Sequence, residues 1–106
     1  MAKQPLGGVV GSGALTVDLD AYVARLGATI LDVTSSEVEL LALLISNQHR
    51  VVNRKDLARA MGLRQDRSVD VLLSSLRHKT GRDFVRNVRG RGWILDPDQL
   101  GPEPSA

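Results

Sequence analysis

The spacing of apolar residues changes along this 106-residue chain, and each change predicts a different kind of element. From residue 14 to residue 33 the apolar residues lie in short runs rich in β-branched side chains, which is typical of strands. Asp20-Ala21 and Gly27-Ala28 separate these runs. The pattern therefore predicts a three-stranded antiparallel meander over Ala14–Leu19, Tyr22–Leu26 and Thr29–Val33.

A helical period of about 3.6 residues begins at the end of this meander. Thr34 is followed three residues later by Glu37, which is the capping box that starts many helices. The side chains expected to form the buried stripe of this first helix are Val38, Leu41, Leu44 and Ile45.

Two more helices and a hairpin complete the pattern. A second helix is predicted after Asn53, with Asp56 in its first turn and Gly62 at its end; its inward residues are Leu57, Ala60 and Met61. A third helix is predicted from Arg67 to Lys79, stopping before Gly81. Residues 83–88 and 92–95 then form a closing hairpin, in which Gly90 and Gly92 supply the positive φ of a two-residue reversal.

The two ends of the chain lack this periodicity. Residues 1–13 contain the stretch GGVVGSG and predict a flexible leader or linker. Residues 97–106 hold three prolines and predict a disordered tail. Residues 14–96 are therefore expected to form one domain.

Charge is divided unevenly along the chain. Residues 1–49 carry two Lys or Arg and five Asp or Glu, a net charge of −3, whereas residues 50–91 carry twelve Lys or Arg and four Asp or Glu, a net charge of +8. Eleven of the fourteen cations are Arg, which binds phosphate and guanine in a bidentate manner better than Lys does. The asymmetry indicates an anionic partner for the middle of the chain.

Composition removes several other functions. The chain has no Cys, so disulfides, thiolate metal sites and a cysteine nucleophile are excluded. Neither a signal peptide nor a run long enough to span a bilayer is found, so no membrane partner is expected and the predicted location is cytoplasmic, in association with the nucleoid. His49 and His78 lie on different segments without a paired nucleophile, so we expect neither an enzyme nor a cofactor.

The third helix carries the first candidate binding surface. Val69, Leu72, Leu73 and Leu76 follow the i, i+3, i+4, i+7 pattern and are expected to face the core. The opposite face is short and polar, and a helix of this kind fits a major groove about 12 Å wide. That face carries Arg67, Val71, Ser74 and His78, flanked by Asp70, Ser75 and Arg77.

The hairpin carries the second candidate surface. Arg86, Arg89 and Arg91 lie on or beside its turn, and a narrow tip bearing Arg suits the negative potential of a minor groove. A hairpin whose charges only discourage aggregation between sheets is the structural alternative.

With both surfaces in view, the chain resembles the winged-helix DNA-binding domain of OmpR/PhoB-type response regulators, part of two-component systems. The resemblance runs from about Leu15 to Leu95 and rests on four stretches in the family's order: VTSSEVELLALL, VVNRKDLARAMG, RSVDVLLSSLRHK and VRNVRGRGWIL. It implies an α+β fold, a winged helix-turn-helix with an N-terminal antiparallel sheet, three helices and a C-terminal β-hairpin wing.

The resemblance also implies roles for individual residues. Asp70, Val71, Ser74 and Ser75 occupy the base-facing positions of the recognition helix. Arg89 occupies the minor-groove position of the wing, with Arg91 beside it. The residues at or next to phosphate-contacting positions are Arg54, Arg67, Arg77, Lys79 and Asn87.

Partners follow from the same resemblance. The expected partner is double-stranded DNA, bound sequence-specifically by a transcription regulator, with head-to-tail pairs on direct repeats. The chain departs from the family in having Met61 at a frequent Trp position and Leu72 at a common His position. The loop GLRQDR is also short, and this puts a contact with RNA polymerase through that loop in doubt. No receiver domain is expected within the sequence, which is either an excised effector domain or a stand-alone relative.

Two alternatives of other classes stay open. A winged helix can act as a protein-interaction module, with its Arg-rich face bound to an acidic partner. It can also be an architectural protein that binds DNA without sequence preference, which the two serines of the recognition helix favour. The salt dependence of duplex binding and the enrichment of a sequence motif separate these alternatives from regulation.

Overall fold

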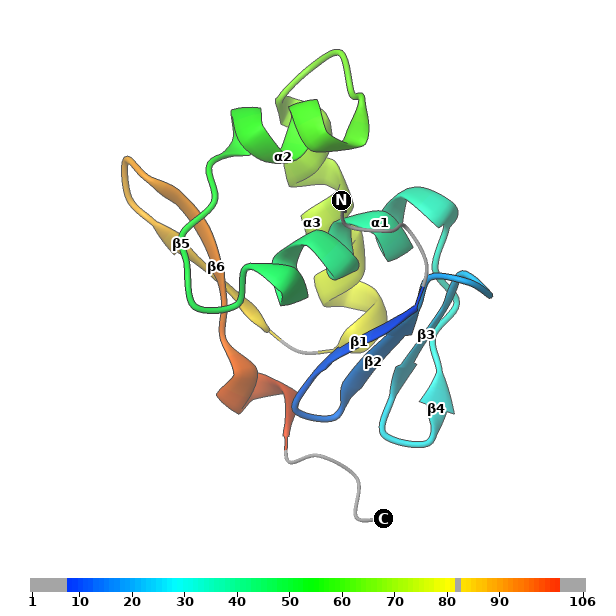
Figure 1. Ribbon diagram of the computed structural model, residues 1–106. Helices are drawn as coiled ribbons and strands as arrows, with labels where there is room; N and C mark the ends of the chain where they lie inside the picture. The colour runs from blue at the N-terminus through cyan, green and yellow to red at the C-terminus, as the bar shows by residue number, and fades with distance from the viewer. Residues whose placement is uncertain (1–7, 82, 102–106) are drawn as a thin grey trace.

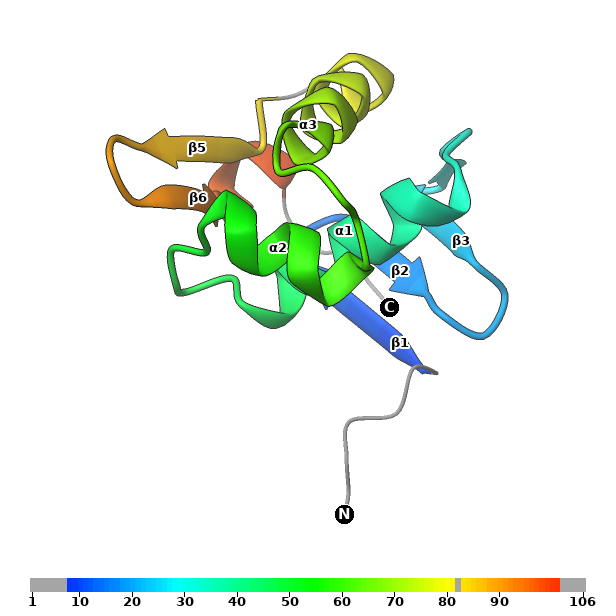
Figure 2. The same cartoon turned by 90° about the horizontal axis from the view of Figure 1, so that it is seen from above.

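A sheet, three helices and a hairpin follow one another in the computed structural model, in which residues 8–81 and 83–101 are described (Figure 1). The helices lie between the N-terminal sheet and the C-terminal hairpin, so the hairpin projects from the opposite side of the molecule from the sheet (Figure 2). This order confirms the predicted winged-helix architecture.

The N-terminal sheet has four strands, one more than predicted. They are β1 (Val9–Ser12), β2 (Leu15–Asp18), β3 (Val23–Leu26) and β4 (Thr29–Ile30), paired antiparallel in that order. The prediction that residues 1–13 form a flexible leader is therefore wrong for residues 9–12, since β1 pairs with β2 from Val9↔Asp18 to Ser12↔Leu15. Residues 1–7 of that leader lie outside the described part of the chain.

The expected meander strands are also shorter than their apolar runs. The strand predicted to continue to Val33 ends at Ile30, and α1 (Ser35–Ser46) begins soon after it. On β2 the alternation has its expected effect, because Leu15 and Val17 are fully buried beneath α1.

The predicted capping box of α1 is present. The Thr34 hydroxyl accepts a hydrogen bond from Glu37 N at 3.2 Å, and a Glu37 carboxylate oxygen accepts one from Thr34 N at 2.8 Å. The expected buried stripe is confirmed for Val38, Leu41, Leu44 and Ile45. This helix is the centre of the core, which also includes Leu40 and Ala42.

Helix α2 (Arg54–Met61) begins and ends as the sequence predicts. Asn53 accepts a hydrogen bond from Asp56 N at 2.8 Å, and Gly62 closes the helix with φ +72°. Leu57 is buried and Met61 packs against the core, but Ala60 is exposed. The alanine that faces the core is Ala58, so the inward assignment of Ala60 is wrong.

Helix α3 (Arg67–Thr80) leads to the hairpin of β5 (Val85–Val88) and β6 (Gly92–Leu95). Val88 pairs with Gly92, so three residues and not two make the reversal. The expected positive φ is found at both glycines, +75° at Gly90 and +145° at Gly92.

The hairpin is fastened to the linker between α1 and α2. Val52 and Trp93 exchange two backbone hydrogen bonds of 2.8 Å each, which form a single antiparallel β-bridge between the linker and the wing. At Gly92 a Cβ atom would lie against the Val52 carbonyl and 2.6 Å from Asn53 Cα. Glycine is therefore required there by both its φ and its close approach to a neighbouring backbone.

The C-terminal segment is ordered further than predicted. Pro97–Leu100 form a 3-10 helix (η1), and Leu100 is fully buried in the core. The prediction of a disordered tail from residue 97 is therefore wrong for residues 97–100, because burying one leucine contributes about 1.5–3 kcal/mol. Residues 102–106 lie outside the described residues.

Replacing Gly92 with alanine is expected to lower the free energy of unfolding by about 2–4 kcal/mol, because a strained φ and a backbone clash add. Gly90→Ala is the matched control, since Gly90 also has positive φ but a Cβ there meets nothing within 4 Å. It should cost about 1–2 kcal/mol. Urea unfolding followed by circular dichroism measures both. Equal losses of unfolding free energy in the two variants would show that the Val52 backbone does not require glycine at position 92.

Candidate nucleic-acid interface

The outer face of α3 is exposed as the helical period predicts. Val69, Leu73 and Leu76 are buried, and Leu72 packs against the core at its edge. On the opposite side Val71 is 67% exposed. The other exposed residues of this face are Arg67, Ser74 and His78.

One flank of α3 is fixed by a buried acid. Glu37 of α1 is only 2% exposed, and its carboxylate accepts hydrogen bonds from the Ser75 hydroxyl at 2.6 Å and from Lys79 Nζ at 2.7 Å. Together with the bond from Thr34 N, three donors surround one carboxylate. The Ser75 and Lys79 side chains, predicted to contact a base and a phosphate, are thus bonded inside the domain.

This arrangement lowers the pKa of Glu37 below its ordinary value of 4.5. Burial alone raises the pKa of this carboxyl, but the hydrogen bonds from Lys79, Ser75 and Thr34 N outweigh burial and favour the charged form. The negative charge is therefore held permanently at neutral pH, where it fixes α3 against α1.

The N-terminal half of α3 is joined to α2 by an ion pair. Arg54 Nη1 lies 2.5 Å from Asp70 Oδ2, and both side chains remain about half exposed. Asp70, predicted to face a base, and Arg54, predicted to contact a phosphate, thus contact each other. Because the pair is exposed, we expect its contribution to stability to be below about 1 kcal/mol.

The wing presents its arginines to solvent. Arg86, Arg89 and Arg91 are all exposed, and Arg91 N donates to Val88 O at 2.8 Å to close the turn. Asn87 donates from Nδ2 to Gly92 O at 3.2 Å, so its amide, predicted to contact a phosphate, supports the turn instead. The tip of the hairpin therefore carries Arg89 and Arg91 on a braced loop.

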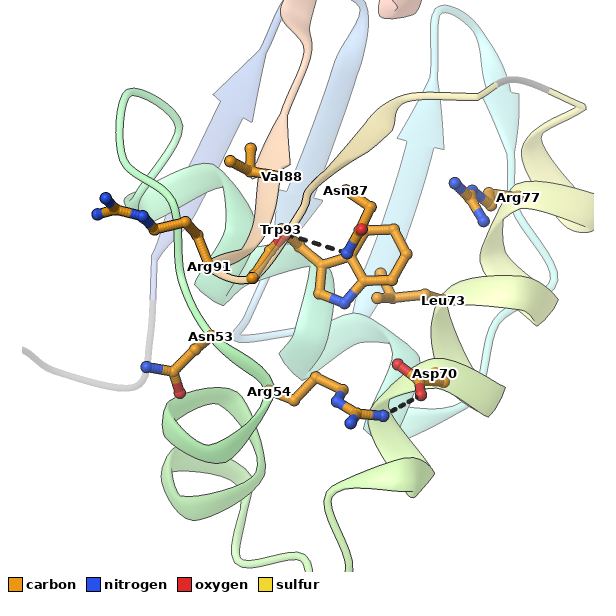
Figure 3. Close-up of a pocket in the computed structure, with 11 residues that line it drawn as sticks. Asn53, Arg54, Asp70, Leu73, Arg77, Asn87, Val88, Arg91 and Trp93 are labelled. Atoms are coloured by element: carbon orange, nitrogen blue, oxygen red, sulfur yellow. Dashed lines mark hydrogen bonds and ion pairs between the residues drawn. The ribbon is translucent and has the colours of Figure 1, made fainter.

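Helix and wing meet at an open hollow of about 680 Å³ (Figure 3). Trp93 lies at its centre, and the Arg77 guanidinium carbon is 5.2 Å from the centre of the Trp93 ring, a cation–π contact. Arg77 also donates to Val85 O at 3.4 Å, and its Nε lies 3.0 Å from Asp83 Oδ1 without hydrogen-bond alignment. Arg77, predicted to contact a phosphate, thus connects α3 to the wing.

The structure divides the predicted site residues into two groups. The side chains that are exposed and make no side-chain hydrogen bond or ion pair within the described residues are Arg67, Val71, Ser74, Arg89 and Arg91. Those that are bonded to other parts of the domain are Arg54, Asp70, Ser75, Arg77, Lys79 and Asn87. No group of three or more metal-ligating side chains gathers within residues 8–81 and 83–101.

The sequence of this chain matches a known protein family. The model of the family described as "Transcriptional regulatory protein, C terminal" matches residues 27–95. The chain belongs to this family. Its winged helix is that of the C-terminal domains of transcriptional regulatory proteins, and the resemblance to OmpR/PhoB-type response regulators is confirmed.

Three relatives of this chain illustrate the likeness. The response regulator ArlR of Staphylococcus haemolyticus is 30% identical over 90% of this chain and 47% of its own length, so the chain spans about half of that relative. The DNA-binding domain of CpxR from Escherichia coli superposes with a TM-score of 0.74 at 26% identity, covering 94% of this chain and all of that one. The RstA DNA-binding domain of Klebsiella pneumoniae, solved in complex with the RstA box, gives 0.73 at 26% identity over 84% and 97%.

Two residues of the site were missed from the sequence. Glu37 was identified only as a capping residue, and nothing local indicates that it also binds α3, 38 and 42 residues further along the chain. Trp93 carried a usable signal, because it is the only tryptophan and directly follows the wing glycine.

Within the described part of the chain, no helix is long and apolar enough to cross a membrane.

Replacing Glu37 with glutamine is expected to lower the free energy of unfolding by about 1–3 kcal/mol at pH 7, because glutamine is uncharged and offers Lys79 and Ser75 one acceptor oxygen in place of two. The folded pKa is lowered, so the stabilisation is complete above pH 4.5 and is lost as the pH falls through the folded value. The difference between wild type and variant should therefore shrink below that pH.

Urea unfolding at a series of pH values measures this difference. Glu39→Gln is the matched control on the same helix, where the carboxylate accepts only an exposed hydrogen bond from Tyr22 at 3.1 Å among the described residues. It should change the stability by less than about 0.5 kcal/mol. A gap between wild type and Glu37→Gln that stays constant with pH would contradict the charged network.

Proposed function

We propose that this domain is the sequence-specific, double-stranded DNA-binding part of a bacterial transcription regulator. The outer face of α3 enters the major groove, and the wing tip with Arg89 and Arg91 enters the adjacent minor groove. The observation that carries this proposal is that α3 and the wing meet around one open hollow, which Asp70 and Arg77 of α3 and Arg91 of the wing help to line. Val71 of α3 and Arg89 of the wing are both exposed.

The dimensions and chemistry of this surface support the proposal. A helix about 10–12 Å in diameter fits the major groove, where the Val71 methyl groups can contact a thymine methyl and the Ser74 hydroxyl a base edge. Arg89 and Arg91 suit the concentrated negative potential of a narrow minor groove. Arg67, exposed at the start of α3, is placed for a phosphate contact.

The internal bonds of the other predicted residues narrow their proposed roles. A base contact by Ser75 or Asp70 requires breaking its hydrogen bond to Glu37 or to Arg54. We therefore propose that base reading rests mainly on Val71 and Ser74, and that the wing contributes a large share of the affinity. Water-mediated contacts are expected beside these short side chains.

The finer expectations on partners belong to the same proposal. Two copies are expected to bind head-to-tail on direct repeats about one helical turn apart. The α2–α3 connection, residues 62–66, is short, so we do not propose a contact with RNA polymerase through it.

Selection of retained duplexes from a random library at two salt concentrations tests the function. One enriched motif, above all one repeated at the spacing of a helical turn, is the expected result. Retention without a motif that vanishes at the higher salt would indicate an architectural binder. Absence of retention at both concentrations would reject DNA binding and favour a protein partner.

Replacing Arg89 with alanine is expected to weaken binding to the selected duplex by about 1–3 kcal/mol, the range of one good groove contact. Arg25→Ala is the matched control, because Arg25 is also exposed but lies on β3, on the other side of the helices from the wing (Figure 2). Titration of labelled duplex by fluorescence anisotropy measures both. An Arg89 variant with the affinity of the Arg25 variant would reject the wing assignment.

A further inference from the structure

A second charged hollow lies at the corner where α2 meets α3. It has a volume of about 660 Å³, and it is separate from the hollow between α3 and the wing except for sharing Arg54. In Figure 1 the connection between α2 and α3 lies at the top, well apart from the wing tip on the left. The residues that line this corner hollow are Arg54, Arg64, Gln65, Asp66 and Arg67.

The backbone around this corner hollow is fixed. Gly62 N donates to Arg59 O at 3.1 Å and Leu63 N to Ala58 O at 2.8 Å, which is the Schellman pattern of a closed helix end. Leu63 also packs against the core. Arg64 follows directly, so its backbone is anchored while its side chain is exposed.

The charges at the corner hollow are not balanced. Arg54 is paired with Asp70, but Arg64 and Arg67 make no ion pair and no side-chain hydrogen bond within the described residues. Asp66 is the only acid among the lining residues, against three arginines. The corner hollow therefore has a surplus of positive charge, and a planar guanidinium binds phosphate oxygens in a bidentate manner.

We propose that the corner hollow binds a backbone phosphate of the DNA, with Arg64 and Arg67 donating to its oxygens. This inference rests on the proposed function and extends it, because Arg64 was not among the residues expected from the family resemblance. It gives the α2–α3 connection a part in DNA binding, and it places a phosphate contact away from the wing.

The test is the salt dependence of binding to the selected duplex for the full chain, Arg64→Ala and Arg25→Ala. Loss of one phosphate contact reduces the slope of log K against log salt by about 0.9. The affinity ratio of wild type to Arg64→Ala should therefore fall by about three- to fourfold between 50 and 200 mM salt. Arg25→Ala should keep the wild-type slope.

Two further variants separate charge from other effects. Arg64→Lys keeps the cation, so it should retain the slope but bind more weakly than wild type, because the bidentate geometry is lost. Asp66→Asn removes the carboxylate from the corner hollow and should tighten binding, most strongly at low salt. Asn is as good as Asp at this helix start, so the fold should be preserved.

The outcomes distinguish this inference from the proposed function. If Arg64→Ala keeps the slope of wild type while Arg89→Ala binds weakly, Arg64 does not hold a DNA phosphate in the corner hollow, and this inference is rejected while the groove-binding proposal stands. The slope of Arg64→Ala is also expected to equal that of wild type if Arg64 and Arg67 bind an acidic protein and not DNA. If the wild-type chain binds no duplex, both proposals are rejected together.

Discussion

The buried carboxylate of Glu37 is the constraint on which the orientation of the recognition helix depends. It receives the Thr34 amide that starts α1 and the Ser75 and Lys79 side chains of α3, so one group closes the first helix and anchors the third. A buried charge is tolerated only when it is fully bonded, and here three donors satisfy it. The direction of α3, and with it the face that α3 exposes, follows from this contact.

The position of the wing is fixed mainly by backbone contacts. Val52 and Trp93 hold the wing to the α1–α2 linker, and Gly92 permits the close approach. Arg77 then spans from α3 to the Trp93 ring. Helix and wing are therefore joined by several short contacts from different elements, and their relative position is fixed before any ligand arrives.

The sequence predicted what depends on local spacing. The faces of α3, the capping box at Thr34 and the end of α2 at Gly62 were all predicted correctly, because each depends on residues within a turn or two. Ala60 was placed inward in error because α2 is only two turns long, so a small rotation changes which alanine faces the core. β1 was not predicted because Gly11 and the flanking Gly8 and Gly13 interrupt its apolar pattern, and local spacing does not reveal its pairing with β2.

The site could be predicted in outline but not in detail. Position on a helical face does not reveal that a side chain is already bonded, and the partners of Ser75 and Lys79 are 38 and 42 residues away in sequence. The same applies to Asp70 with Arg54, 16 residues apart. The family resemblance predicted a role for each of these residues, and the structure shows which of their side chains are already bonded to other parts of the domain.

The cation–π contact of Trp93 has a practical consequence. The chain holds one tryptophan, and its indole lies half-buried in the hollow between α3 and the wing, next to Arg77. Tryptophan emission depends on the polarity and charge around the ring. The protein thus contains a single native fluorophore at the junction of helix and wing, which makes their separation visible in solution without a label.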